Sequence, residues 1–85
     1  MNEITKYEEI VPAGGCVCIC YNNAEIWDSR EEAARSFMEG MYYSEGAESE
    51  RYENVLFDIL AGKPVCHDGV SEQVFSVSHG QREMF

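Results

Sequence analysis

The stretch CVCICYNNAEIWDSREE, residues 16–32, contains the pattern of a strand, a turn, a second strand and a helix start. Residues 16–21 are all apolar or aromatic, with β-branched side chains between the cysteines, which favours a buried strand. Asn22 and Asn23 tolerate positive φ, so we expect a tight turn into a second strand over residues 24–27. The stretch therefore predicts an antiparallel β-hairpin.

Two helices are predicted after the hairpin. Ser29 and Glu32 form a capping box, which predicts a helix over residues 29–43. A second amphipathic helix is predicted over residues 46–61, ended by Gly62. The short connection between them makes the two helices antiparallel neighbours. The apolar stripes expected to face the core are Ala34, Phe37, Met38, Met41 and Tyr42 in the first helix, and Tyr52, Val55, Leu56, Ile59 and Leu60 in the second.

We therefore predict an α+β fold in a single domain, residues 1–85. A small antiparallel β-sheet, with its hairpin at residues 16–27, packs against the antiparallel helical hairpin. Gly40 is expected to weaken the last turns of the first helix. Residues 4–11 and 73–78 predict two further strands, the second with no evident pairing partner.

The chain carries sixteen acidic and six basic residues, a formal net charge of −10 over 85 residues. This charge repels nucleic acid and anionic membranes and attracts basic protein surfaces, so we expect neither direct nucleic-acid binding nor membrane binding. The N-terminal residues lack the basic start and apolar run of a secretory signal. We therefore expect a cytoplasmic protein. The alternative is that the acidity serves solubility alone.

Three cysteines alternate along the first predicted strand, where Cys16, Cys18 and Cys20 share one face. Cytosolic thiols stay reduced, so disulfides are not expected. We interpret these cysteines as small apolar residues that let a helix approach closely. Thiols about 7 Å apart along a straight strand cannot all reach one ion. We accordingly predict no cofactor and no stoichiometric zinc.

The alternative for the cysteines is a zinc-binding or redox-responsive small domain. Its ligands would be drawn from Cys16, Cys18 and Cys20 together with Cys66 and His67. Catalysis by Cys66, His67 and Asp68 is not expected, because adjacent residues of an extended chain point apart. No phosphate-binding loop or metalloprotease motif occurs. We predict that the protein is not an enzyme.

Acidic residues concentrate in the predicted helical hairpin, where the span from Glu39 to Asp58 contains six acids and a single base, Arg51. Phe57 lies off the apolar stripe and should be partly exposed, and aromatics beside acids make binding surfaces. The alternative is that Phe57 packs under the C-terminal segment or in a homodimer. The predicted partner-binding residues are Tyr42, Tyr43, Glu45, Glu48, Glu50, Glu53, Phe57 and Asp58.

Residues 25–63 resemble small acidic proteins carried by bacterial phages and conjugative elements. The resemblance rests on Trp-Asp-Ser, on Ser-Glu-Gly-Ala-Glu-x-Glu-Arg-Tyr and on a helix ending in Leu-x-Gly-Lys. It implies an accessory protein of a mobile element and carries over no residue role. By analogy, small acidic proteins of this origin include anti-CRISPR inhibitors that occupy basic nucleic-acid channels. We expect a protein-binding module for a basic host effector, with a structural dimer as a further alternative.

Overall fold

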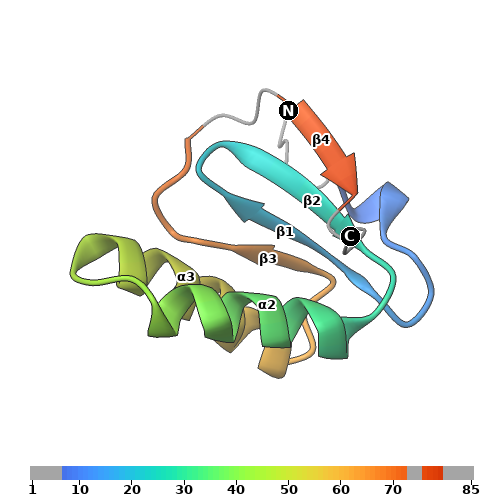
Figure 1. Cartoon of the computed structure of the whole chain (residues 1–85). Coiled ribbons are helices and arrows are strands. Elements are labelled where there is room, and N and C mark those ends of the chain that lie inside the picture. Colours follow the sequence, from blue (N-terminus) through green and yellow to red (C-terminus); the bar gives the residue numbers. More distant parts are fainter. Residues whose placement is uncertain (1–6, 73–75, 80–85) are drawn as a thin grey trace.

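A four-stranded sheet lies on two helices (Figure 1). The computed structural model describes residues 7–72 and 76–79, the last four by their backbone alone. In chain order the elements are a 3-10 helix (Glu8–Ile10), β1 (Cys16–Cys20), β2 (Asn23–Trp27), α2 (Arg30–Tyr42), α3 (Ala47–Leu60), β3 (Val65–His67) and β4 (Ser76–His79). The predicted α+β fold is confirmed.

The sheet is built around the predicted antiparallel hairpin of β1 and β2, in which Cys20 pairs with Asn23. The turn residues are Tyr21 and Asn22, both at positive φ, so the prediction of a turn at Asn22 and Asn23 is wrong by one position. Tyr21 is held in this conformation by tertiary contacts: its backbone N–H donates to Asp68, and its ring stacks under the guanidinium of Arg51.

Both outer strands run parallel to their neighbours, giving the order β3-β1-β2-β4. The last strand, which had no evident partner in the sequence, pairs with β2. Residues 73–75 of that prediction lie outside the described residues, as do residues 4–6 of the first predicted strand. Glu8–Ile10 form a 3-10 helix, so the strand predicted there is wrong.

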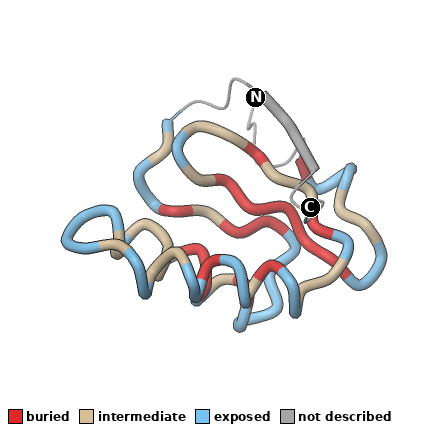
Figure 2. Tube along the Cα trace, in the orientation of Figure 1, coloured by how far each residue is buried: buried red, intermediate tan, exposed pale blue. Residues whose placement is uncertain are grey.

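The central strand β1 is buried on both faces (Figure 2). Val17 and Ile19 face away from the helices and pack with Tyr7 and other residues of the chain. Cys16 and Cys18 face the helices and pack against Phe37, Leu56 and other core residues of α2 and α3. The predicted placement of these two cysteines against the helices is confirmed.

Local signals at the helix ends behave as predicted. The Ser29 hydroxyl accepts a hydrogen bond from the backbone N–H of Glu32 at the start of α2. At the end of α3, Gly62 has a φ of 84°. The N–H groups of Gly62 and Lys63 donate to the carbonyls of Ile59 and Asp58, which is the Schellman pattern. Each helix therefore ends close to the predicted residue.

The buried side of each helix differs in part from the predicted stripe. Met38, Tyr42 and Leu60 are exposed, so their assignment to the core is wrong. In α2 the packed side instead includes Ala33 and Gly40. A Cβ at Gly40 would lie 3.2 Å from the ring of Tyr52 on α3. Gly40 thus allows the close approach of the two helices, which turns Met38 and Tyr42 outward.

Candidate functional site

The outer side of α3 carries carboxylates and one large aromatic side chain. Glu48 and Glu50 are exposed, Glu53 is half-buried and Phe57 is 58% exposed. Glu50 and Phe57 are seven residues apart and so lie on the same side of the helix. That side faces away from the core residues Val55, Leu56 and Ile59. The predicted partial exposure of Phe57 is therefore confirmed.

Two exposed tyrosines lie at the connection between α2 and α3. Tyr42 and Tyr43 are 80% and 81% exposed, and their rings meet edge to face with centroids 5.1 Å apart. Glu45, also exposed, follows them in the connection. We call the set Tyr42, Tyr43, Glu45, Glu48, Glu50, Glu53 and Phe57 the acidic surface.

Asp58, the remaining predicted partner-binding residue, makes contacts within the chain. Its Oδ2 accepts a hydrogen bond from the backbone N–H of His67 at 3.1 Å, and its Oδ1 lies 3.3 Å from Lys63 Nζ. These contacts tie the last turn of α3 to β3. Because Asp58 makes these structural contacts, we do not include it in the acidic surface.

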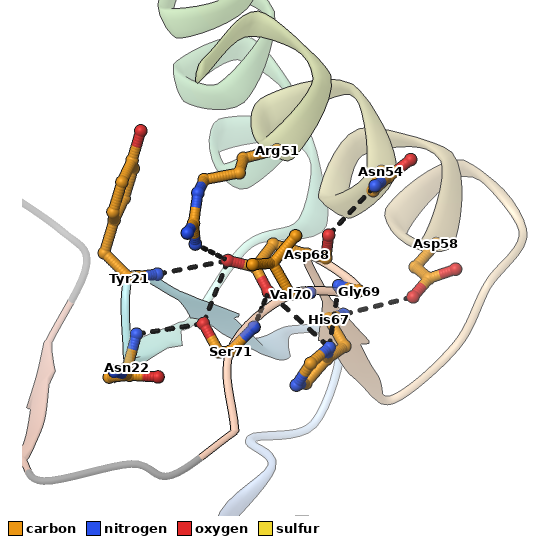
Figure 3. A network of polar contacts seen from close by, with 10 residues as sticks. All are labelled: Tyr21, Asn22, Arg51, Asn54, Asp58, His67, Asp68, Gly69, Val70 and Ser71. Atoms are coloured by element: carbon orange, nitrogen blue, oxygen red, sulfur yellow. Dashed lines mark hydrogen bonds and ion pairs between the residues drawn. The ribbon is translucent and has the colours of Figure 1, made fainter. Parts of the chain in front are cut away.

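Arg51, the single base in this acidic span, points toward Asp68 (Figure 3). Its Nη1 lies 2.7 Å from Asp68 Oδ2, and its Cζ lies 4.3 Å from the centroid of the Tyr21 ring. The positive charge of Arg51 therefore compensates the buried carboxylate of Asp68. In the described part of the chain, no salt bridge reaches a carboxylate of the acidic surface.

Asp68 is fully buried and holds three segments together (Figure 3). Its carboxylate accepts hydrogen bonds from the backbone N–H groups of Tyr21, Val70 and Ser71 and from the Ser71 hydroxyl. Burial by itself would raise the pKa of Asp68, but these donors outweigh it and lower the pKa to about 2. The carboxylate is therefore a charged structural anchor.

The thiols of Cys16, Cys18 and Cys66 meet in the core between the sheet and the helices. Their sulfur atoms all lie within 4.8 Å of one another, and the Sγ atoms of Cys16 and Cys18 are 3.8 Å apart. The expected separation of about 7 Å along the strand is thus wrong for this pair, because the two side chains lean toward each other. We call these three residues the thiol cluster.

The thiols of this cluster titrate as one unit. Hydrogen bonds from Cys18 and Cys66 lower the pKa of Cys16, and the charge of Arg30 acts in the same direction against burial. The hydrogen bond to Cys16 raises the pKa of Cys18 and raises that of Cys66 to about 12. Cys16 is therefore the most acidic thiol of the cluster.

The other two predicted ligand candidates lie outside the cluster. Cys20 is half-buried, and burial, followed by the charge of Asp68, raises its pKa to about 12. His67 lies on β3 next to Cys66, where alternation points it to the opposite face. Its Nδ1 accepts a hydrogen bond from the backbone N–H of Gly69. Of the five predicted metal ligands, the structure therefore brings three together, Cys16, Cys18 and Cys66.

Sequence reasoning missed Arg30, Arg51 and Asp68 as organising residues. The Asp68-Gly69-Val70-Ser71 sequence is a turn signal, since an aspartate can accept N–H bonds from residues two and three positions on. That signal could have identified Asp68 as a turn residue. No local signal pairs either arginine with its partner, because those contacts join segments far apart in the chain.

Comparisons of this chain with models of protein families, with curated proteins and with solved structures found no match. No helix among the described residues has the length and apolar character needed to cross a bilayer. Function must therefore be inferred from the geometry of the acidic surface and of the thiol cluster.

Proposed function

We propose that the protein is a small acidic binding module whose acidic surface occupies a basic surface of a partner protein. The observation that carries the proposal is the disposition of charge on α3. Glu50 and Phe57 share the outer side of α3 and Glu48 is exposed in its first turn, whereas Arg51 is turned inward to Asp68. An exposed helix side with carboxylates and no base complements a groove lined by Lys and Arg.

Carboxylates on this surface would replace the phosphates of a nucleic acid in the partner's groove. The exposed rings of Tyr42, Tyr43 and Phe57 would supply the apolar anchors that dominate binding energy at interfaces. We place the module in the cytoplasm as an accessory protein of a phage or mobile element. Its action would be competitive occupation of a host effector, in the manner of an anti-CRISPR inhibitor, without catalysis by its own residues.

The experiment uses two charge-reversal variants of equal net charge. Glu50→Lys with Glu53→Lys changes the acidic surface, and Glu8→Lys with Glu9→Lys changes two exposed residues of the 3-10 helix. A partner captured from host lysate by the wild type is identified, purified and titrated with both variants. We expect the α3 variant to bind at least about tenfold more weakly and the control variant to bind nearly as well as the wild type.

Varying the salt concentration tests the electrostatic part of the mechanism, and the uncharged substitution Phe57→Ala tests the apolar part. Raising NaCl from about 0.05 to about 0.2 M should weaken binding and slow association. Phe57→Ala should weaken binding without changing the salt dependence. Equal loss from both charge-reversal variants would reduce the effect to bulk charge, and binding unaffected by either would refute the proposal. A wild-type homodimer in sedimentation that Phe57→Ala dissociates would favour a structural dimer instead.

A further inference from the structure

The thiol cluster is the densest group of metal-binding atoms in the described residues. We propose that Cys16, Cys18 and Cys66 bind one Cu(I) ion. This site is separate from the acidic surface and does not depend on the proposed partner binding. The inference follows from sulfur geometry, from the elements that present the thiols, from the neighbouring charge and from the number of donors.

The sulfur atoms are already spaced as ligands of one ion. Two thiolates bound to a common ion at about 2.3 Å lie about 3.8–4.0 Å apart, for tetrahedral to trigonal angles. Cys16 Sγ and Cys18 Sγ are 3.8 Å apart, and Cys66 Sγ lies within 4.8 Å of both. Closing the cluster around an ion requires only a small movement of Cys66.

The thiols are presented by rigid, paired strands. Cys18 is the direct register partner of Cys66 across the parallel pair of β1 and β3, and Cys16 lies two residues along on the same face of β1. All three residues are 0% exposed. Ligands on hydrogen-bonded strands with fixed rotamers are pre-organised for one geometry.

A positive charge lies beside the cluster. The guanidinium of Arg30 is fixed by hydrogen bonds to the carbonyls of Gly15, at 3.2 Å, and Ile59, at 2.6 Å. This guanidinium is held next to Cys16, because Gly15 directly precedes Cys16 in the chain. Three thiolates with one Cu(I) leave an anionic centre, which a fixed guanidinium would partly neutralise. Binding would release the remaining thiol protons to solvent.

The number of donors favours Cu(I) over Zn(II). Structural zinc takes four ligands, and three-ligand zinc sites keep a water. Within the described residues, no histidine or carboxylate joins the three thiols, and their full burial leaves no access for solvent. Cu(I) is a soft ion that prefers thiolates and is stable with three of them.

The test refolds the reduced protein without oxygen in the presence of Cu(I) held by a weak competing chelator. We expect about one copper per chain by elemental analysis and a thiolate-to-copper absorption band in the ultraviolet. Trp27, the only tryptophan, is the register partner of Cys16. Its fluorescence should therefore change on binding.

Cys20 provides the matched control, because it lies on the same strand and face but outside the cluster. Cys20→Ala should bind copper like the wild type, whereas Cys16→Ala, Cys18→Ala and Cys66→Ala should each lower the affinity at least about tenfold. Circular dichroism shows which variants fold. Alkylation mapping in the wild type needs no variant: in mild denaturant, which exposes the buried thiols, Cu(I) should slow alkylation of the cluster thiols but not that of Cys20.

Three outcomes would overturn the inference. The first is wild-type protein that refolds without retaining copper. The second is loss of copper from Cys20→Ala equal to that from the cluster variants. The third is displacement of Cu(I) by an equimolar amount of Zn(II), which would show a site with a fourth ligand.

Discussion

Asp68 sits at the point where the β-hairpin turn, the loop after β3 and α3 meet. It is 0% exposed and pairs with Arg51, whose side chain is 24% exposed. A buried carboxylate is tolerated only when hydrogen bonds and an opposite charge compensate for its lost hydration. Here four donors and one guanidinium do so. One residue thereby fixes the conformation of Tyr21.

Asp68→Asn should destabilise the fold by about 3 kcal/mol, because it leaves Arg51 without its carboxylate and cannot accept the same set of hydrogen bonds. Urea unfolding measures the loss. Glu50→Gln is the control, since it also removes one negative charge but from an exposed position. Equal unfolding midpoints for the wild type and Asp68→Asn would contradict the structural role.

Lowering the pH should remove the stabilisation by the Asp68 carboxylate in the wild type. The folded-state pKa of Asp68 is lowered from 3.8 to about 2, so its stabilisation is present above the unfolded-state value. It is lost as the pH falls from about 4 towards about 2. Asp68→Asn should lack this share of the acid dependence. Unfolding free energies measured across that range for both proteins make the comparison.

Among the elements, α3 links the core to the acidic surface. Its inner side contributes Val55, Leu56 and Ile59 to the core, and its outer side carries the acidic surface. Its end is set by Gly62 at a φ of 84°, which directs the chain through Lys63 and Pro64 into β3. The position of Cys66 in the thiol cluster therefore depends on this helix end.

Gly62→Ala should destabilise the protein by about 1–2 kcal/mol, because a side chain is disfavoured at that positive φ. No neighbouring atom obstructs the added carbon within 4 Å, so the cost is conformational alone. Thermal unfolding measures it. Gly62→Asn should lose less, since asparagine tolerates this conformation. A larger loss for asparagine than for alanine would contradict this account.

At the scale of the whole molecule, the net charge of −10 is spread unevenly. Arg30 and Arg51 both turn inward, where they bind backbone carbonyls and the Asp68 carboxylate. The outer side of the helical layer is left with an excess of carboxylates. Their mutual repulsion destabilises the folded state, which the proposed function would explain as the cost of a binding surface.

Screening should relieve that repulsion. We expect the thermal midpoint of the wild type to rise by several degrees between about 0.05 and 0.5 M NaCl. The buried Arg51–Asp68 pair is screened less than the exposed carboxylates and should not reverse the trend. Glu39→Lys with Glu53→Lys, which leaves the acidic first turn of α3 unchanged, should raise the midpoint at low salt and flatten the dependence. A midpoint that falls with salt in the wild type would contradict the prediction.

Local patterns in the sequence sufficed for the β-hairpin, the two helices and the fold class, but not for β3 or for the 3-10 helix at Glu8–Ile10. The capping box at Ser29, the C-terminal glycine at Gly62 and the alternation from Cys16 to Cys20 each act within a few residues. The exposure of Phe57 also followed from helical periodicity alone. Such signals are readable because backbone geometry fixes which residues share a face.

Only the tertiary structure decided which distant residues meet. Cys66 joins Cys16 and Cys18 because β3 enters the sheet parallel to β1 with Cys66 opposite Cys18. Arg51 turns from the acidic surface to Asp68, and Tyr21 adopts its positive φ there. Each of these depends on the register between segments separated by a helix or more. No short-range pattern in the sequence encodes that register, because it is set by how the helices and strands pack together.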